Sequence, residues 1–317
     1  MRKFFATAAV AAGVVAGVSA ASAQVVGIAT SNPGSLFHNI GTAVANAANA
    51  AGLNTTIQPA TSPNQFIPFL NQGGIEFGVA NLQEVEYAIT GAEWWNGVAN
   101  ENLRIVGHLQ PLVEAIFVRA DSDIMSVSDL RGQAMTDGYT AQNTILPQLS
   151  AFYSTAGMTR DDVEQISVAS VVAGANAFMA GDTVGFIFAH GAGKVREADA
   201  AVGGLRALGV EDDSDAALAA AREHWPTAFF TTLPAGAMPG VLEDTTYIAF
   251  PQVVFTHANV SDDVVYAMAR AMYEGGQVMG ESFPPMRAFR GENMRGDLGV
   301  SQYHPGAIRF FEEMGLN

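Results

Sequence analysis

Apolar residues recur along the chain in short runs typical of strands and at the three-to-four-residue spacing typical of helices. In the first third, strands are predicted at 25–30, 53–58 and 75–80. Helices are predicted at 36–51, stopped by Gly52, and from Ser62 and Pro63 to near Gly73, since Ser and Pro suit an N-cap and a first helical position. This alternation indicates a parallel sheet covered by helices, whose ligands lie beyond the carboxyl ends of the strands.

A second round of the same alternation follows the apolar run 113–118. Strands are predicted at 134–136, 165–171 and 184–189, with a helix at about 141–156 that Pro147 should kink or delay. The chain then returns through a Pro/Gly-rich passage, 233–240, to an extended run at 246–255 and a long helix opened by Ser261. Two α/β lobes are therefore predicted, with 24–113 and 246–317 in lobe 1 and 114–245 in lobe 2.

Residues 1–23 have the pattern of a secretory signal peptide. Arg2 and Lys3 precede an apolar stretch at 4–18, and a small-x-small cleavage sequence ends at Ala23. The stretch is shorter than the ~20 residues that a membrane helix needs, although a membrane anchor is the alternative. No Cys follows to carry a lipid. We therefore expect a periplasmic chain that starts at Gln24, is not lipidated and does not insert into a membrane.

Composition excludes several classes of function. The 317 residues contain no Cys, which rules out disulfides, thiol nucleophiles and Cys-ligated metals. The formal charge of −16 becomes −18 once Arg2 and Lys3 are removed, which argues against nucleic acid as a partner. The chain shows no Gly-x-Ser-x-Gly elbow, zinc-protease pair, phosphate-binding loop or dinucleotide fingerprint. We predict no enzyme, cofactor or metal; an exported hydrolase whose catalytic residues lie far apart in sequence is the alternative.

Four segments carry a resemblance to a known family. They are 26–45, 103–132 with the sequence EAIFVRAD at 114–121, 233–240, and HPGA at 304–307 followed by Arg309, Phe310 and Phe311. Together they resemble the TAXI family of solute receptors, the extracytoplasmic binding proteins of tripartite ATP-independent periplasmic (TRAP) transporters. The resemblance implies a type II periplasmic-binding-protein fold, with two α/β lobes joined by a two-crossing hinge and the ligand in the cleft.

The same resemblance implies a small organic anion as ligand, either an acidic amino acid or a dicarboxylate, with glutamate and 2-oxoglutarate as examples. It also implies a monomeric receptor that delivers this solute to the membrane subunits of a TRAP permease. A receptor for an ABC-type importer is the alternative.

In lobe 1, the candidate ligand-binding residues follow the first and third strands. The loop after the first strand places backbone N–H groups and hydroxyls before a helix, where an anion would lie, although a simple turn with an N-cap explains the same residues. Asn81 follows the third strand, and its amide both donates and accepts, but it also suits a helix N-cap. Pro33 departs from the glycine-rich loop of the family. The lobe 1 candidates are Ser31, Asn32, Gly34, Ser35, Phe37 and Asn81.

In lobe 2, a polar cluster follows the strand at 134–136, where Tyr139 would occupy space that relatives leave to the solute. His190 and Gly191 end a later strand at the same rim, and a structural histidine is the alternative there. Arg119 could contact a carboxylate or pair with Asp121 or Asp123, and the acidic run from Glu211 to Asp215 is interpreted as a solvated helix start. The lobe 2 candidates are Thr140, Gln142, Asn143, Thr144, His190 and Gly191.

Overall fold

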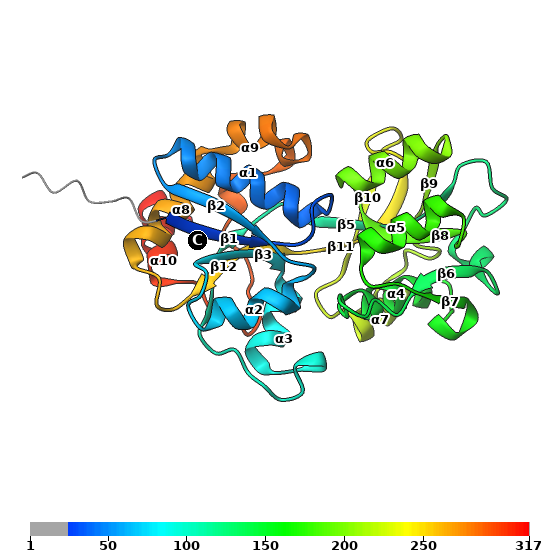
Figure 1. The fold of residues 1–317 in the computed structure, drawn as a ribbon, viewed down its shortest axis with the longest axis horizontal. Coiled ribbons are helices and arrows are strands. Elements are labelled where there is room, and N and C mark those ends of the chain that lie inside the picture. Colours follow the sequence, from blue (N-terminus) through cyan, green and yellow to red (C-terminus); the bar gives the residue numbers. More distant parts are fainter. Residues whose placement is uncertain (1–24, 317) are drawn as a thin grey trace, which may run out of the picture.

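Two α/β lobes, each built on its own sheet, make up the computed structural model, which describes residues 25–316 (Figure 1). The sheet of lobe 1 has the strand order β2-β1-β3-β12-β4, and that of lobe 2 has β10-β11-β5-β8-β6-β7, with β9 paired to β5. The predicted mixed α/β class is confirmed. The predicted signal peptide and the start at Gln24 lie outside the described residues.

Lobe 1 holds the beginning and the end of the described chain. Its strands are β1 (Val25–Thr30), β2 (Asn54–Pro59), β3 (Phe77–Asn81), β4 (Leu103–His108) and β12 (Gln252–His257). Its helices are α1 (Leu36–Ala50), α2 (Pro63–Asn71), α3 (Leu82–Thr90), α8 (Asp262–Glu274), α9 (Gly276–Ser282) and α10 (Pro305–Met314). Since β1 pairs in parallel with both β2 and β3, their carboxyl ends meet at one edge of the sheet.

Lobe 2 holds the middle of the chain. Its strands are β5 (Leu112–Arg119), β6 (Ala134–Asp137), β7 (Glu164–Ser167), β8 (Gly185–Ala189), β9 (Leu205–Leu208), β10 (Phe229–Leu233) and β11 (Thr245–Phe250). Its helices are α4 (Ile145–Ser154), α5 (Val171–Ala180), α6 (Gly193–Val202) and α7 (Asp215–His224). The core is aromatic, with Phe117 and Phe186 buried and stacked 5.5 Å apart between ring centroids.

Three elements differ from their predicted bounds by more than two residues or by a split. The helix predicted from 141 begins at Ile145, which puts Pro147 in its first turn, where a missing N–H costs nothing. The strand predicted to reach 171 ends at Ser167, because Ser170 accepts from the Ala173 N–H and caps α5. The extended run at 246–255 is two strands in different sheets, separated by Pro251. We still propose the division into two lobes, but with the return from lobe 2 to lobe 1 at Pro251 instead of at residue 246.

Within residues 25–316, no helix combines the length and the apolar character needed to cross a membrane.

Candidate functional site

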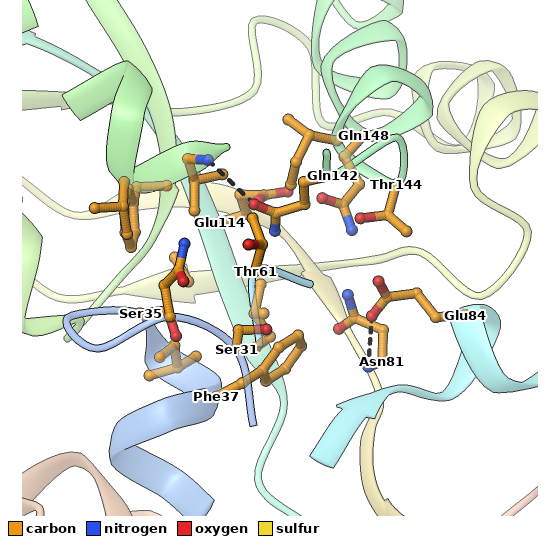
Figure 2. Close-up of a pocket in the computed structure, with 18 residues that line it drawn as sticks. Ser31, Ser35, Phe37, Thr61, Asn81, Glu84, Glu114, Gln142, Thr144 and Gln148 are labelled. Carbon is orange, nitrogen blue, oxygen red and sulfur yellow. Dashed lines mark hydrogen bonds between the residues drawn. The ribbon is translucent and has the colours of Figure 1, made fainter. Parts of the chain in front are cut away.

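A pocket with about 490 Å³ of empty space, part of it open to solvent, lies between the two lobes. Lobe 1 lines it with the residues that follow β1, β2 and β3, and lobe 2 lines it with the start of β5, the starts of α4 and α5, and the end of β8. Figure 2 shows the labelled polar side chains converging on this space from both lobes. The lining residues are Ser31, Asn32, Ser35, Leu36, Phe37, Thr61, Asn81, Glu84, Leu112, Glu114, Gln142, Thr144, Ile145, Gln148, Val171, Val172, Phe188 and Ala189.

The start of α1 forms one side of the pocket. Ser35 caps the helix, since its Oγ accepts from the His38 N–H at 3.2 Å. The N–H groups of Leu36 and Phe37 are in the first turn, where a helix offers no acceptor of its own. The helix dipole also places partial positive charge here. This side of the pocket therefore suits an anionic or acceptor group.

Two carboxyl groups lie in the same pocket. Glu84, on α3, accepts from the Asn81 N–H at 3.0 Å, and Glu114 is on β5 in the other lobe; both side chains are buried. Burial raises the pKa of Glu84 to about 7, although hydrogen bonds from Asn81 and Thr144 partly offset it. Burial, and then repulsion from Glu84, raises the pKa of Glu114 to about 8. Among the described residues that line the pocket, none is Lys, Arg or His.

Gln142 and Thr144 bring the start of α4 into the pocket. The Gln142 Oε1 accepts from the Val171 N–H at 3.1 Å, as the dashed line in Figure 2 marks, so its NH₂ group is left to donate elsewhere. Thr144 is buried at the helix start, yet it has helical backbone angles and makes no side-chain cap hydrogen bond. Its hydroxyl therefore does not cap α4, and its partner in the pocket is Glu84.

Several buried oxygens of the pocket have no hydrogen-bond partner within the described part of the chain. They are Ser31 Oγ, Asn81 Oδ1, Glu114 Oε2 and Gln148 Oε1. An unsatisfied buried polar atom costs about 1–3 kcal/mol, so a group of them at one cavity points to a ligand that supplies the missing partners. The two amide oxygens and an ionised Glu114 only accept, so a ligand that donates hydrogen bonds would satisfy them, whereas the Ser31 hydroxyl can donate or accept.

The structure gathers seven of the predicted site residues and leaves five outside. The residues that line the pocket are Ser31, Asn32, Ser35, Phe37, Asn81, Gln142 and Thr144. Thr140 and Asn143 are exposed, because alternate residues of the loop before α4 face solvent. The carbonyl of Gly34 instead accepts from the Lys194 N–H of lobe 2 at 3.2 Å. Gly191 lies against Pro285 and does not line the pocket.

His190 and Tyr139 belong to the interior of lobe 2. The His190 ring lies edge-on to Phe117 and Tyr247, and burial lowers its pKa to about 3, so it stays neutral. Tyr139 is fully buried, with its hydroxyl 2.7 Å from that of Thr136, and it does not line the pocket. Tyr139 thus belongs to the core of lobe 2 and not to the lining of the pocket.

Two further candidates have ordinary structural roles. Arg119 forms an exposed ion pair with Asp121 at 2.9 Å, which is the second of the two alternatives predicted for it. The acidic run at 211–215 makes structural contacts. Glu211 accepts from the Ser128 N–H at 3.0 Å, and Ser214 caps α7. In the part of the chain that the structure describes, no group of three or more His, Cys, Asp or Glu could hold a metal ion.

Sequence reasoning missed Glu84 and Glu114 as site residues. Glu84 lies three positions after Asn81. This spacing is typical of a helix cap, so it gave no reason to assign Glu84 a role in binding. Glu114 left a clearer signal, because it is a single charge within an apolar strand sequence, and an acid is seldom buried without a partner.

Direct hydrogen bonds join the lobes on both sides of the pocket. Besides the bond from Lys194 to Gly34, the Thr227 N–H of lobe 2 donates to Gln83 Oε1 of lobe 1 at 3.1 Å. The structure is thus a closed form, in which the two lobes enclose the pocket.

Two α/β lobes that close on a solute-sized pocket define the fold class of periplasmic solute-binding proteins. A solved periplasmic transporter protein shares this fold, with a TM-score of 0.56 and 11% identity over 93% of this chain and 94% of that one. A protein from Bordetella bronchiseptica has a TM-score of 0.55 and 11% identity over 92% and 98%. The ligand-binding component of an ABC-type import system from Staphylococcus aureus, solved with zinc bound, has a TM-score of 0.50 and 10% identity over 93% of each chain.

Sequence comparison gives the family. The model of the NMT1-like family matches residues 28–315, nearly the whole described chain, and the protein therefore belongs to the NMT1-like family.

Proposed function

We propose that this protein is a periplasmic solute-binding protein, which captures a small organic molecule between its lobes and delivers it to a membrane transporter. The observation that carries the proposal is the closed pocket, whose buried oxygens lack partners within the described chain. Family membership and the two-lobed fold support binding, because both lobes contribute to one enclosed space and no catalytic arrangement is needed to explain it.

We propose that the membrane partner, to which the protein delivers its solute, is a TRAP permease of the TAXI type. Its support is the set of four segments that resemble TAXI receptors, two of which, 26–45 and 103–132, contain pocket residues. An ABC-type importer is the second candidate, favoured by the Staphylococcus aureus structure that shares the fold.

We further propose that the solute carries an anionic group bound at the start of α1. The helix N-terminus favours an anion by about 0.3–2 kcal/mol, and each charge-assisted hydrogen bond adds about 1.5–3 kcal/mol. Micromolar binding needs about 8 kcal/mol, which four or so such bonds reach after ordering costs are met. The hydroxyls of Ser31 and Ser35 and the first-turn amides of α1 can supply these bonds without a basic side chain.

A thermal-shift screen of organic acids and amino acids on refolded, ligand-free protein tests the binding proposal. A ligand at 100 times its dissociation constant should stabilise the protein by about 2.7 kcal/mol. Absence of any shift across the screen would count against solute binding. Capture of the TRAP permease by liganded protein, but not by ligand-free protein, tests the partner, and capture of an ABC permease instead would leave the binding function standing and change the partner.

A further inference from the structure

Glu84 of lobe 1 and Glu114 of lobe 2 both line the same pocket (Figure 2). We propose that these two carboxylates bind a protonated amine of the solute. The ligand class is then a small organic molecule with a cationic nitrogen, not a simple dicarboxylate. This inference rests on the proposed function and narrows its ligand.

The hydrogen-bonding capacity of the site supports an amine. Glu114 is 3% exposed, and its Oε2 has no partner among residues 25–316. The buried Asn81 Oδ1 and Gln148 Oε1 also lack donors in that part of the chain. An ammonium group offers three donors and no acceptor, which suits a space lined by unpartnered oxygens. Glu84 already accepts hydrogen bonds from Asn81 and Thr144, and since a carboxylate can accept about four, capacity remains for the solute.

Charge balance leads to the same ligand class. Closure brings two acids from opposite lobes into a space with no basic side chain among its lining residues. Two carboxylates in one enclosed site repel each other, and one cation placed against both removes that repulsion. A dicarboxylate would add negative charge, and both acids would then have to remain protonated.

The same pocket can hold an anionic group at its other side. Ser35, at the start of α1, and Glu84 lie on opposite sides of the pocket in Figure 2. A zwitterion could therefore place its carboxylate against α1 and its ammonium against the acids. This arrangement unites the anion predicted from sequence with the acidic pair that sequence reasoning missed.

The two binding modes differ in their dependence on pH. Carboxylates that hold an ammonium must be ionised, so affinity for an amine should rise as pH increases from about 5.5 to 7.5, a range in which an aliphatic amine stays protonated. Protonated acids that donate to a carboxylate would give the opposite trend. Of the other titratable groups near the pair, His190 and Tyr139 stay neutral in this range because both are buried, and burial lowers the pKa of His38. Asp137 pairs with Arg160 and does not line the pocket.

Calorimetric titration of the ligand-free protein with matched solute pairs tests the proposal. The pairs are L-glutamate and glutarate, L-aspartate and succinate, and 4-aminobutyrate and butyrate, which differ only in the amine. The expected result is at least about tenfold tighter binding of the amine in each pair that binds, since about 1.4 kcal/mol corresponds to a factor of ten. Equal or tighter binding of the amine-free member overturns the inference and leaves the solute-binding function intact.

Isosteric variants provide a second arm. Glu84→Gln and Glu114→Gln should each weaken amine binding about tenfold or more and reduce its rise with pH, while binding of amine-free acids stays equal or improves. Glu101→Gln, an exposed site in lobe 1, makes the same charge change away from the pocket and should have no effect. Amine affinity unchanged in both pocket variants overturns the inference. If no compound binds in these titrations or in the thermal-shift screen, both the inference and the proposed solute-binding function fail.

Discussion

Glu114 is a carboxylic acid in a strand whose neighbouring buried residues are apolar, and its environment should be visible in the pH dependence of stability. Burial raises the pKa of Glu114 to about 8 from an ordinary value of 4.5, so the native state binds more protons than the unfolded state between these pH values. The free energy of unfolding must then fall as pH rises through this window, by up to about 1.4 kcal/mol for each pH unit.

Glu114→Gln removes this titration. At about pH 5 the variant and the wild type should melt at similar temperatures, because the acid is then protonated in the native state. At about pH 8.5 the ligand-free variant should melt several degrees higher. Scanning calorimetry at both pH values checks this, with Glu101→Gln as the control. A difference in melting temperature that does not change with pH would show that Glu114 is solvated in the ligand-free protein.

Substitution of Thr144 tests whether this residue contacts the ligand or only caps α4. Its side chain makes no cap hydrogen bond, so Thr144→Ala should weaken solute binding by about 1–3 kcal/mol and leave the ligand-free melting temperature nearly unchanged. Asn143→Ala, at the exposed neighbouring position, should affect neither quantity. Calorimetric titration and melting of both variants provide the comparison. A lowered melting temperature with wild-type affinity would mean that Thr144 serves only the helix.

The place of the polar loop residues in the pocket could be predicted from the sequence, but the place of the two buried acids, Glu84 and Glu114, could not. Ser31, Ser35 and Asn81 follow strands in the sequence, and the carboxyl ends of parallel strands meet at one edge, so their convergence follows from local pattern. The meeting of Glu84 with Glu114 depends on how the two lobes close. No local pattern encodes that closure, and single-residue reasoning therefore assigned Glu84 no role.

At the scale of elements, the ion pair between Asp137 and Arg160 joins the end of β6 to the 3-10 turn at Arg160–Asp162. Asp137 is 1% exposed, and the Arg160 Nε donates to its Oδ2 at 2.8 Å. Arg160→Gln should lower the free energy of unfolding by roughly 2–4 kcal/mol, because it leaves a buried carboxylate uncompensated. Solute affinity should hold, since neither residue lines the pocket.

Arg131→Gln is the matched control for this prediction. Arg131 pairs with Asp162 at the surface, where an ion pair contributes about 0–1 kcal/mol. Urea denaturation of both variants gives the comparison. Equal losses of stability in the two would show that burial adds nothing to the Asp137 pair.

Strands and helices with strong local signals were predicted well, and the errors have physical causes. The strand at 25–30 and the helix opened by Ser261 match β1 and α8, because alternation and capping residues determine both. The run at 165–171 continued too far because Val168 and Val171 favour strands, yet the Ser170 cap begins a helix there. The split of 246–255 between two sheets is a tertiary feature to which only Pro251 gave a clue.

At the scale of the whole molecule, the closed form should be favoured by hydrogen bonds remote from the solute. Gln83→Ala removes the acceptor of the Thr227 N–H across the lobes and leaves the lining of the pocket unchanged. Since one hydrogen bond contributes about 0.5–1.5 kcal/mol, solute affinity should fall about two- to tenfold. Gln277→Ala, on the exposed surface of α9, is the control. Unchanged affinity in the Gln83 variant would mean that this bond does not help closure.

A crystal structure of the mature protein with its tightest-binding solute tests the central claim most directly, because it reports the ligand, its orientation and the state of the lobes together. We predict a single small molecule between the lobes, with a nitrogen within hydrogen-bond distance of both Glu84 and Glu114 and an oxygen at the start of α1. The Lys194–Gly34 and Thr227–Gln83 bonds should be present. A solute bound outside this pocket, or lobes closed over water alone, would refute the claim.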